Sequence, residues 1–95
     1  MENFNKLTPA EHERLTVLLE EMAEAIHAVG KVLRYGYENS NPNTGVVNRG
    51  NLESELGDVR YAMIMLCEAG DLNKERIHYF ARMKRERIGR YLHHQ

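Results

Sequence analysis

The sequence lacks tryptophan and has one cysteine, Cys67, and two prolines among its 95 residues. A single cysteine excludes an intrachain disulfide, which agrees with the reducing cytoplasm where we expect the protein. The longest charge-free apolar run, residues 61–67, is far shorter than the roughly 20 residues of a membrane span. The first residues also lack the apolar stretch of a signal peptide. These absences predict a soluble cytoplasmic protein that neither crosses a membrane nor is exported.

Length and composition predict a single folded domain, residues 1–95. Apolar residues make up 42% of the chain and charged residues 28%, which excludes wholesale disorder. A chain this short buries only a modest core, so we expect oligomers if it is purely helical. The net charge of −1 conceals −6 over residues 1–71 and +5 over residues 72–95. Either solvated helix faces that partly neutralise each other, or a cation site beside an anion site, explains this distribution.

The first predicted helix covers about residues 9–35. Thr8 can cap its N-terminus, Pro9 suits the first helical position, and Glu11 completes a capping box. Gly36 can end the helix. Apolar residues recur every three or four positions, as along one side of a helix. They form the apolar stripe, which consists of Leu15, Leu19, Met22, Ile26, Val29 and Leu33.

Two more helices are predicted after a long loop. Asn, Gly, Ser and Pro crowd residues 36–51, so this segment is either a functional loop or a flexible connector. A second helix covers about 51–69, with Asn51 as its cap, and its second half is apolar nearly all round. A third helix covers about 73–92. The expected fold is all-α: a small bundle of three helices, completed by forming a homodimer or homotetramer because the second helix is too apolar for one chain to cover.

Two pairs of carboxylates occur at the same spacing on the first two predicted helices. Glu21 and Glu24 are three residues apart, and so are Glu55 and Asp58. Side chains at this spacing project from one helix face, where like charges repel unless a cation lies between them. Two such pairs on facing helices supply four hard oxygen donors, which suit Mg²⁺ or Mn²⁺. The alternative is that all four are solvated, as glutamates on helices commonly are.

The two members of the first pair have different surroundings along the helix. Glu21 lies beside a second, weakly apolar strip formed by Ala25, Ala28 and Val32, and packing of this strip would place Glu21 at an interface. Glu24 falls nearly opposite the apolar stripe and taken alone has the position of a solvent residue. We therefore expect Glu24 to join a site only if a second chain or the loop covers its side.

Most of the chain, about residues 15–92, resembles the MazG-like all-α nucleotide pyrophosphohydrolases in two segments, EEMAEAIHAVGKVLRYG and NLESELGDVRYAMIMLCEAGDL. The signature of that family is a Glu-x-x-Glu pair and then a Glu-x-x-Asp pair on the next helix, often within ELGD. Here the pairs are Glu21–Glu24 and Glu55–Asp58. The resemblance is to short members associated with bacteriophage genomes. Thirty residues separate the pairs, longer than is usual in the family, and the extra length lies in the loop.

The resemblance implies hydrolysis of a nucleoside triphosphate between its α- and β-phosphates, which releases the monophosphate and pyrophosphate. It implies Mg²⁺ as cofactor, with Mn²⁺ as a substitute. It also makes Glu21, Glu24, Glu55 and Asp58 both metal ligands and catalytic residues, with Glu24 or Glu21 favoured as general base. Basic side chains should hold the phosphates, although each has a plain surface role as its alternative. The candidates for substrate binding are Lys31, Arg34, Arg49, Lys84 and Arg87.

The sequence also leaves other functions open. The same fold can serve as a non-catalytic helical interaction protein. The basic third helix can bind nucleic acid, but Glu75 and Glu86 interrupt its charge and no nucleic-acid-binding motif accompanies it. Phosphoribosyl-ATP pyrophosphohydrolases are a related alternative that the ELGD form disfavours. Tyr35 and Tyr37, at the start of the loop, either stack on a nucleobase or anchor the loop.

Overall fold

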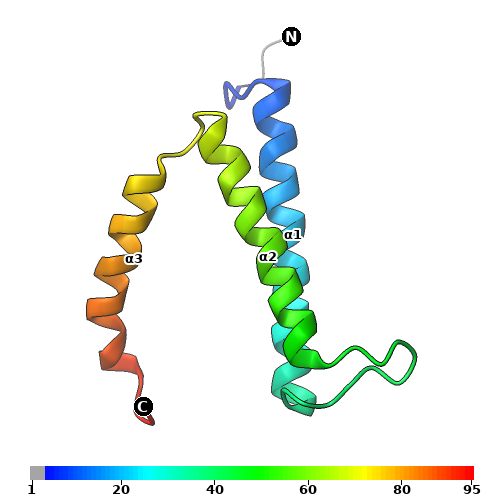
Figure 1. The fold of residues 1–95 in the computed structure, drawn as a ribbon. Coiled ribbons are helices and arrows are strands. Elements are labelled where there is room, and N and C mark those ends of the chain that lie inside the picture. Colours follow the sequence, from blue (N-terminus) through cyan, green and yellow to red (C-terminus); the bar gives the residue numbers. More distant parts are fainter. Residues whose placement is uncertain (1–3) are drawn as a thin grey trace.

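The computed structural model describes residues 4–95, so residues 1–3 of the predicted domain lie outside the described part. Figure 1 shows an all-α chain whose first two helices lie side by side and whose third stands apart. The elements in chain order are α1 (Pro9–Tyr35), α2 (Asn48–Glu68), α3 (Lys74–Ile88) and the short 3₁₀ helix η1 (Gly89–Tyr91). None of these helices is long and apolar enough to span a membrane. The predicted all-α class with three helices is confirmed.

The ends of α1 form as the sequence predicts. The hydroxyl of Thr8 accepts a hydrogen bond from the Glu11 N–H at 3.1 Å, and the Glu11 carboxylate accepts one from the Thr8 N–H at 2.8 Å. Together these two bonds satisfy N–H groups that have no partner inside the helix. Gly36 ends the helix at φ +87°, and its N–H donates to the Val32 carbonyl at 2.7 Å. The helix bounds of 9–35 are therefore confirmed.

The core of the chain is the contact between α1 and α2. α1 contributes Ala25 and Ala28, while α2 contributes Ala62 and Leu66, and none of these side chains is more than 7% exposed. Three of the four are alanines, which let two helix backbones approach closely. The apolar stripe of α1 points elsewhere, since Leu33 on it is 83% exposed. The weaker alanine strip, and not the stripe, packs within the chain.

The loop and the later helices end at other residues than the sequence predicted. α2 begins at Asn48 and not near residue 51, so the loop is shorter and covers residues 36–47. No side chain caps this helix end: the first two N–H groups of α2 donate to the loop carbonyls of Asn39 and Tyr37 instead. Because these bonds are formed by the folded loop, no capping signature in the sequence marks the start. Similarly, α3 ends at Ile88 and continues only as η1.

The connection between α2 and α3 is tied back to the start of α1. Asp71, in this connection, accepts two hydrogen bonds from the Arg14 guanidinium, at 2.6 and 3.0 Å. Beyond it, the Asn73 side chain caps α3 by accepting from the Arg76 N–H. From there α3 runs away from the α1–α2 pair (Figure 1). The expected three-helix bundle is thus not closed within one chain.

The Arg14–Asp71 pair makes stability depend on pH. The hydrogen bonds from Arg14 lower the pKa of Asp71 in the folded protein. Because the Asp71 pKa is lower in the folded than in the unfolded protein, the ionised carboxylate stabilises the fold at any pH above the unfolded pKa of about 3.9. This stabilisation is lost as the pH falls through the Asp71 pKa of the folded protein. We expect Asp71→Asn to lower the urea midpoint at pH 7. Its difference from wild type should begin to shrink below about pH 4 and disappear only once the pH has fallen below the lowered pKa of the folded protein.

Urea unfolding followed by circular dichroism across pH 2.5–7 checks this, with Glu68→Gln as the control because Glu68 is an exposed acid close by on α2. A difference of the same size at pH 3 and pH 7 would mean that the charge of Asp71 does not stabilise the fold.

Candidate metal centre

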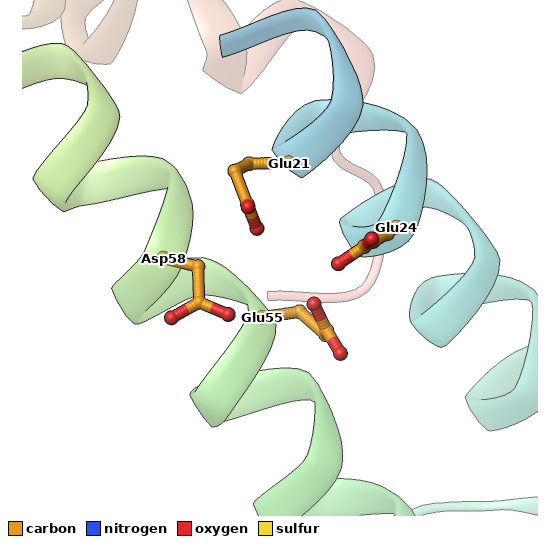
Figure 2. A group of neighbouring side chains, drawn as sticks. All are labelled: Glu21, Glu24, Glu55 and Asp58. Atoms are coloured by element: carbon orange, nitrogen blue, oxygen red, sulfur yellow. The ribbon is translucent and has the colours of Figure 1, made fainter. Parts of the chain in front are cut away.

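Four carboxylates converge halfway along the α1–α2 pair. Glu21 and Glu24 project from α1, while Glu55 and Asp58 project from α2, and all four turn toward one another (Figure 2). One oxygen from each residue lies within 4.8 Å of the others. The sequence predicted these residues from their spacing, and the structure brings them together. We call this group the carboxylate cluster.

The alanine packing explains why acids on two helices meet. Glu21 occurs one turn before Ala25 along the packed strip, and Glu55 occurs two turns before Ala62, so both are half-buried in the seam. Glu24 and Asp58 remain exposed at its edge. The expectation that Glu24 needs cover from a second chain or the loop is wrong. Because α1 packs through its alanine strip, Glu24 sits at the rim of that contact and reaches the cluster directly.

The cluster has more negative charge than its surroundings neutralise. The Oε2 atoms of Glu21 and Glu55 are buried and have no hydrogen-bond partner among the described residues. Burial raises the pKa of Glu21, and repulsion by the other three carboxylates raises it further. Burial is also the main cause of the raised pKa of Glu55, followed by the adjacent Glu24 carboxylate, while Lys31 opposes the rise. Unpaired buried carboxylates are costly, and a divalent cation supplies the missing partner.

The donor set fits Mg²⁺ or Mn²⁺. All four donors are carboxylate oxygens, which hard divalent cations prefer, and no described histidine or cysteine belongs to the cluster. Two donors already lie buried without partners, so a bound cation would satisfy atoms that the fold leaves unsatisfied.

The predicted substrate-binding cations fall into different places. Lys31 is half-buried two turns beyond Glu24 on α1, and its charge acts on Glu55. Lys84 and Arg87 lie on α3, which stands apart from the α1–α2 pair, so one chain does not bring them to the carboxylates (Figure 1). Of these three cations, only Lys31 adjoins the cluster within a chain.

The two remaining cations contact tyrosines of the loop region. Arg34 lies over the Tyr35 ring, 5.8 Å from its centroid. Arg49 lies over the Tyr37 ring at 4.3 Å and also donates to the Glu38 carboxylate at 2.6 and 2.9 Å. With one tyrosine and one carboxylate as partners, Arg49 anchors the loop to the start of α2.

The hollows of the structure were not predicted from the sequence. One hollow, of about 680 Å³, lies between α2 and the start of α3, away from the carboxylates, and its lining includes Met63, Cys67 and Ile77. Two smaller hollows of about 330 and 230 Å³ lie where the loop meets the helices, and Lys31 lines both. The only sequence signal for these was the richness of the loop in asparagine.

Removing one negative charge should show both how much the cluster destabilises the metal-free fold and whether the cluster binds metal. We expect Glu55→Gln to raise the thermal midpoint in the presence of a chelator, because it removes a buried and repelled charge. The same variant should lose most of the rise in midpoint that millimolar Mg²⁺ or Mn²⁺ gives the wild type. Thermal unfolding with and without each metal measures both effects.

Glu53→Gln is the matched control, since Glu53 is an exposed acid on the same helix outside the cluster. If Glu55→Gln and Glu53→Gln respond to metal as wild type does, the cluster does not hold the ion.

Comparisons with known proteins give no relative for this chain: no protein-family model, no curated protein and no solved structure matches it. The likeness to MazG-like enzymes therefore rests on the pattern of residues, and the structure supports its coarser content: a small all-α protein with three helices and an acidic cluster.

Proposed function

We propose that this protein is a divalent-metal-dependent nucleoside triphosphate pyrophosphohydrolase. The observation that carries the proposal is the convergence of four carboxylates from two packed helices, two of them with buried oxygens that lack a partner. Packing that holds like charges together at a cost is typical of a site that binds a cation. The resemblance to MazG-like enzymes supplies the reaction.

Glu21, Glu24, Glu55 and Asp58 would hold Mg²⁺, with Mn²⁺ as a substitute. The ion, when bound, would neutralise phosphate oxygens and so allow an anionic triphosphate to approach an acidic surface. Without this neutralisation, the carboxylates would repel the substrate.

The residues of the chain would then perform the hydrolysis. Glu21 or Glu24 accepts a proton from a water molecule, whose oxygen attacks one of the two phosphorus atoms that share the α–β bridging oxygen. The bond from that same phosphorus to the bridging oxygen breaks, and the nucleoside monophosphate and pyrophosphate separate. Lys31, two turns along α1 from Glu24, is the nearest of the predicted cations and would contact phosphate oxygens.

We also infer that the working form contains at least two copies of the chain. Among the described residues, the buried apolar side chains are three alanines and Leu66, which is too small a core for 95 residues. Leu19 and Ile26 on the apolar stripe are 69% and 71% exposed, at the spacing that pairs one helix with another. A second copy of the chain has the same apolar stripe, and its basic C-terminal segment complements the acidic residues 1–71 of the first copy. We therefore infer that the stripe packs against a second copy of this protein.

Charge on the apolar stripe should disrupt this assembly. We expect wild type to show at least twice the chain mass by light scattering at micromolar concentration, and Ile26→Glu to shift toward a single chain. Val17→Glu is the control, because Val17 is an apolar residue on the opposite side of α1 and is 38% exposed. A wild-type protein of single-chain mass would overturn the assembly.

Pyrophosphate release tests the reaction itself. We expect wild type to release pyrophosphate from at least one canonical ribo- or deoxynucleoside triphosphate with Mg²⁺, and to release none with chelator. Asp58→Asn should lower the rate by about 100-fold or more, because it removes one of the carboxylates that hold the metal ion, and the ion neutralises charge in the transition state. Glu53→Gln should keep the wild-type rate.

Absence of pyrophosphate from the whole panel, with the protein folded and metal-bound, would contradict the proposed reaction. Turnover that survives in Asp58→Asn or in chelator would contradict its mechanism. A steep loss of DNA affinity with salt would then favour nucleic-acid binding through the basic α3.

A further inference from the structure

The loop between α1 and α2 is an ordered structure and not a flexible connector. Ser40 and Val47 form an antiparallel bridge, so the loop folds back on itself as a small hairpin. Within it, the Asn41 N–H donates to the Val46 carbonyl at 2.9 Å, and the Gly45 N–H donates to the Asn41 carbonyl at 2.8 Å. Gly45 has φ +74°, a conformation that suits glycine at such a turn. These bonds fix the shape of the surface that the loop presents.

The ordered loop encloses two adjoining hollows against the helices. The larger, about 330 Å³, is lined by Tyr35 of α1 and by loop residues that include Asn39 and Asn41. The smaller, about 230 Å³, extends toward Asn51 on α2. Lys31, Asn41 and Asn48 line both, so the two hollows are neighbours, and we call them together the loop recess. Its size is that of a site for part of a small ligand.

The loop recess lies in line with the carboxylate cluster. Lys31 follows Glu24 by seven residues on α1, and Asn48 precedes Glu55 by seven on α2. Seven residues are about two turns, or roughly 10 Å along a helix, so both pairs lie on continuing helix faces. Because α1 runs toward the loop and α2 runs away from it, Lys31 and Asn48 both lie on the loop side of the carboxylates. A nucleotide with its phosphates at the cluster would extend its base toward the recess.

The lining of the recess is neutral and rich in amides. Asn48 is only 7% exposed; its Nδ2 donates to the Gly36 carbonyl, while its Oδ1 accepts no hydrogen bond from a described residue. The Asn41 Oδ1 accepts from the backbone N–H groups of Asn43 and Thr44, and these bonds leave its Nδ2 for another partner. The recess therefore offers at least one acceptor, the Asn48 Oδ1, and one donor, the Asn41 Nδ2, that make no hydrogen bond to a described residue.

A phosphate fits this recess poorly. The first two N–H groups of α2, which would attract an anion at a free helix end, already donate to loop carbonyls. Lys31 is the only cation in the lining, and it lies on the side toward the carboxylates. Asparagine amides instead match the paired donors and acceptors at the edge of a nucleobase, and an aromatic ring such as Tyr35 stacks on its face.

We propose that the loop recess binds the nucleobase of the substrate, with Asn41 and Asn48 reading its edge and Tyr35 contacting its face. This inference rests on the proposed function for the direction of the nucleotide, but the recess itself requires neither metal nor phosphate. It makes the loop the part of the chain that selects among nucleoside triphosphates.

Nucleosides without phosphate test the recess independently of catalysis. We would titrate the metal-free protein with adenosine, guanosine, cytidine, uridine and thymidine, and follow its backbone amides by NMR. At least one nucleoside should shift amides of residues 35–51 and leave those of α3 unmoved. Tyr35→Leu should weaken that binding by about five-fold or more, the size expected for loss of a stacked base.

A pair of matched variants tests the reading of the base edge. Asn41→Asp keeps the oxygen that accepts from the turn but removes the amide donor, so binding of the preferred nucleoside should weaken by about ten-fold. Asn43→Asp places the same change at a loop residue outside the recess lining and should bind as wild type does. The ranking of triphosphates by kcat/KM should change in Asn41→Asp alone.

The outcomes separate this inference from the proposed function. Nucleoside binding at the loop without pyrophosphate release from any triphosphate would keep the recess and overturn the reaction. Pyrophosphate release with unchanged loop amides, and with the same nucleotide ranking in Asn41→Asp as in Asn43→Asp, would keep the reaction and overturn the recess.

Discussion

The close approach of α1 and α2 across their alanines determines the rest of the structure. Ala25, Ala28 and Ala62 have no side-chain bulk to hold the helices apart, so side chains beside them reach from one helix to the other. At Glu21 and Glu55 these neighbours are acids and not apolar residues. The packing that forms the core of the chain therefore also builds its most highly charged site.

This arrangement works against stability in the absence of a cation. Two buried oxygens without partners cost free energy, and the alanine contact around them recovers little because alanine buries little apolar surface. Much of the remaining apolar surface of the described residues, including Leu19 and Ile26, faces outward. Metal binding and association between copies would thus each provide part of the stability that one isolated chain lacks.

The sequence predicted correctly those features of the fold that depend on residues close together in the chain. Thr8, Glu11 and Gly36 set the ends of α1, and the spacing of the acids identified the cluster. Other features, which depend on contacts between residues far apart in the chain, were not predicted from the sequence. The sequence showed two apolar faces on α1, and its pattern did not decide that the weaker alanine strip, and not the apolar stripe, packs against α2. The start of α2 and the loop recess depend on hydrogen bonds between loop residues that have no periodic pattern.

The loop joins the two helices at the end of the pair, about three turns beyond Glu24 on α1 and about two turns before Glu55 on α2. Its hydrogen bonds are largely internal or go to the adjoining helix ends, so its sequence can vary while the alanine seam, and with it the cluster, stays in register. The proposed reaction and the proposed choice of nucleotide would thereby be encoded in separate stretches of a very short chain. Replacement of residues 39–46 would then be a route to new ligand preferences at the loop recess that leaves the carboxylate cluster as it is.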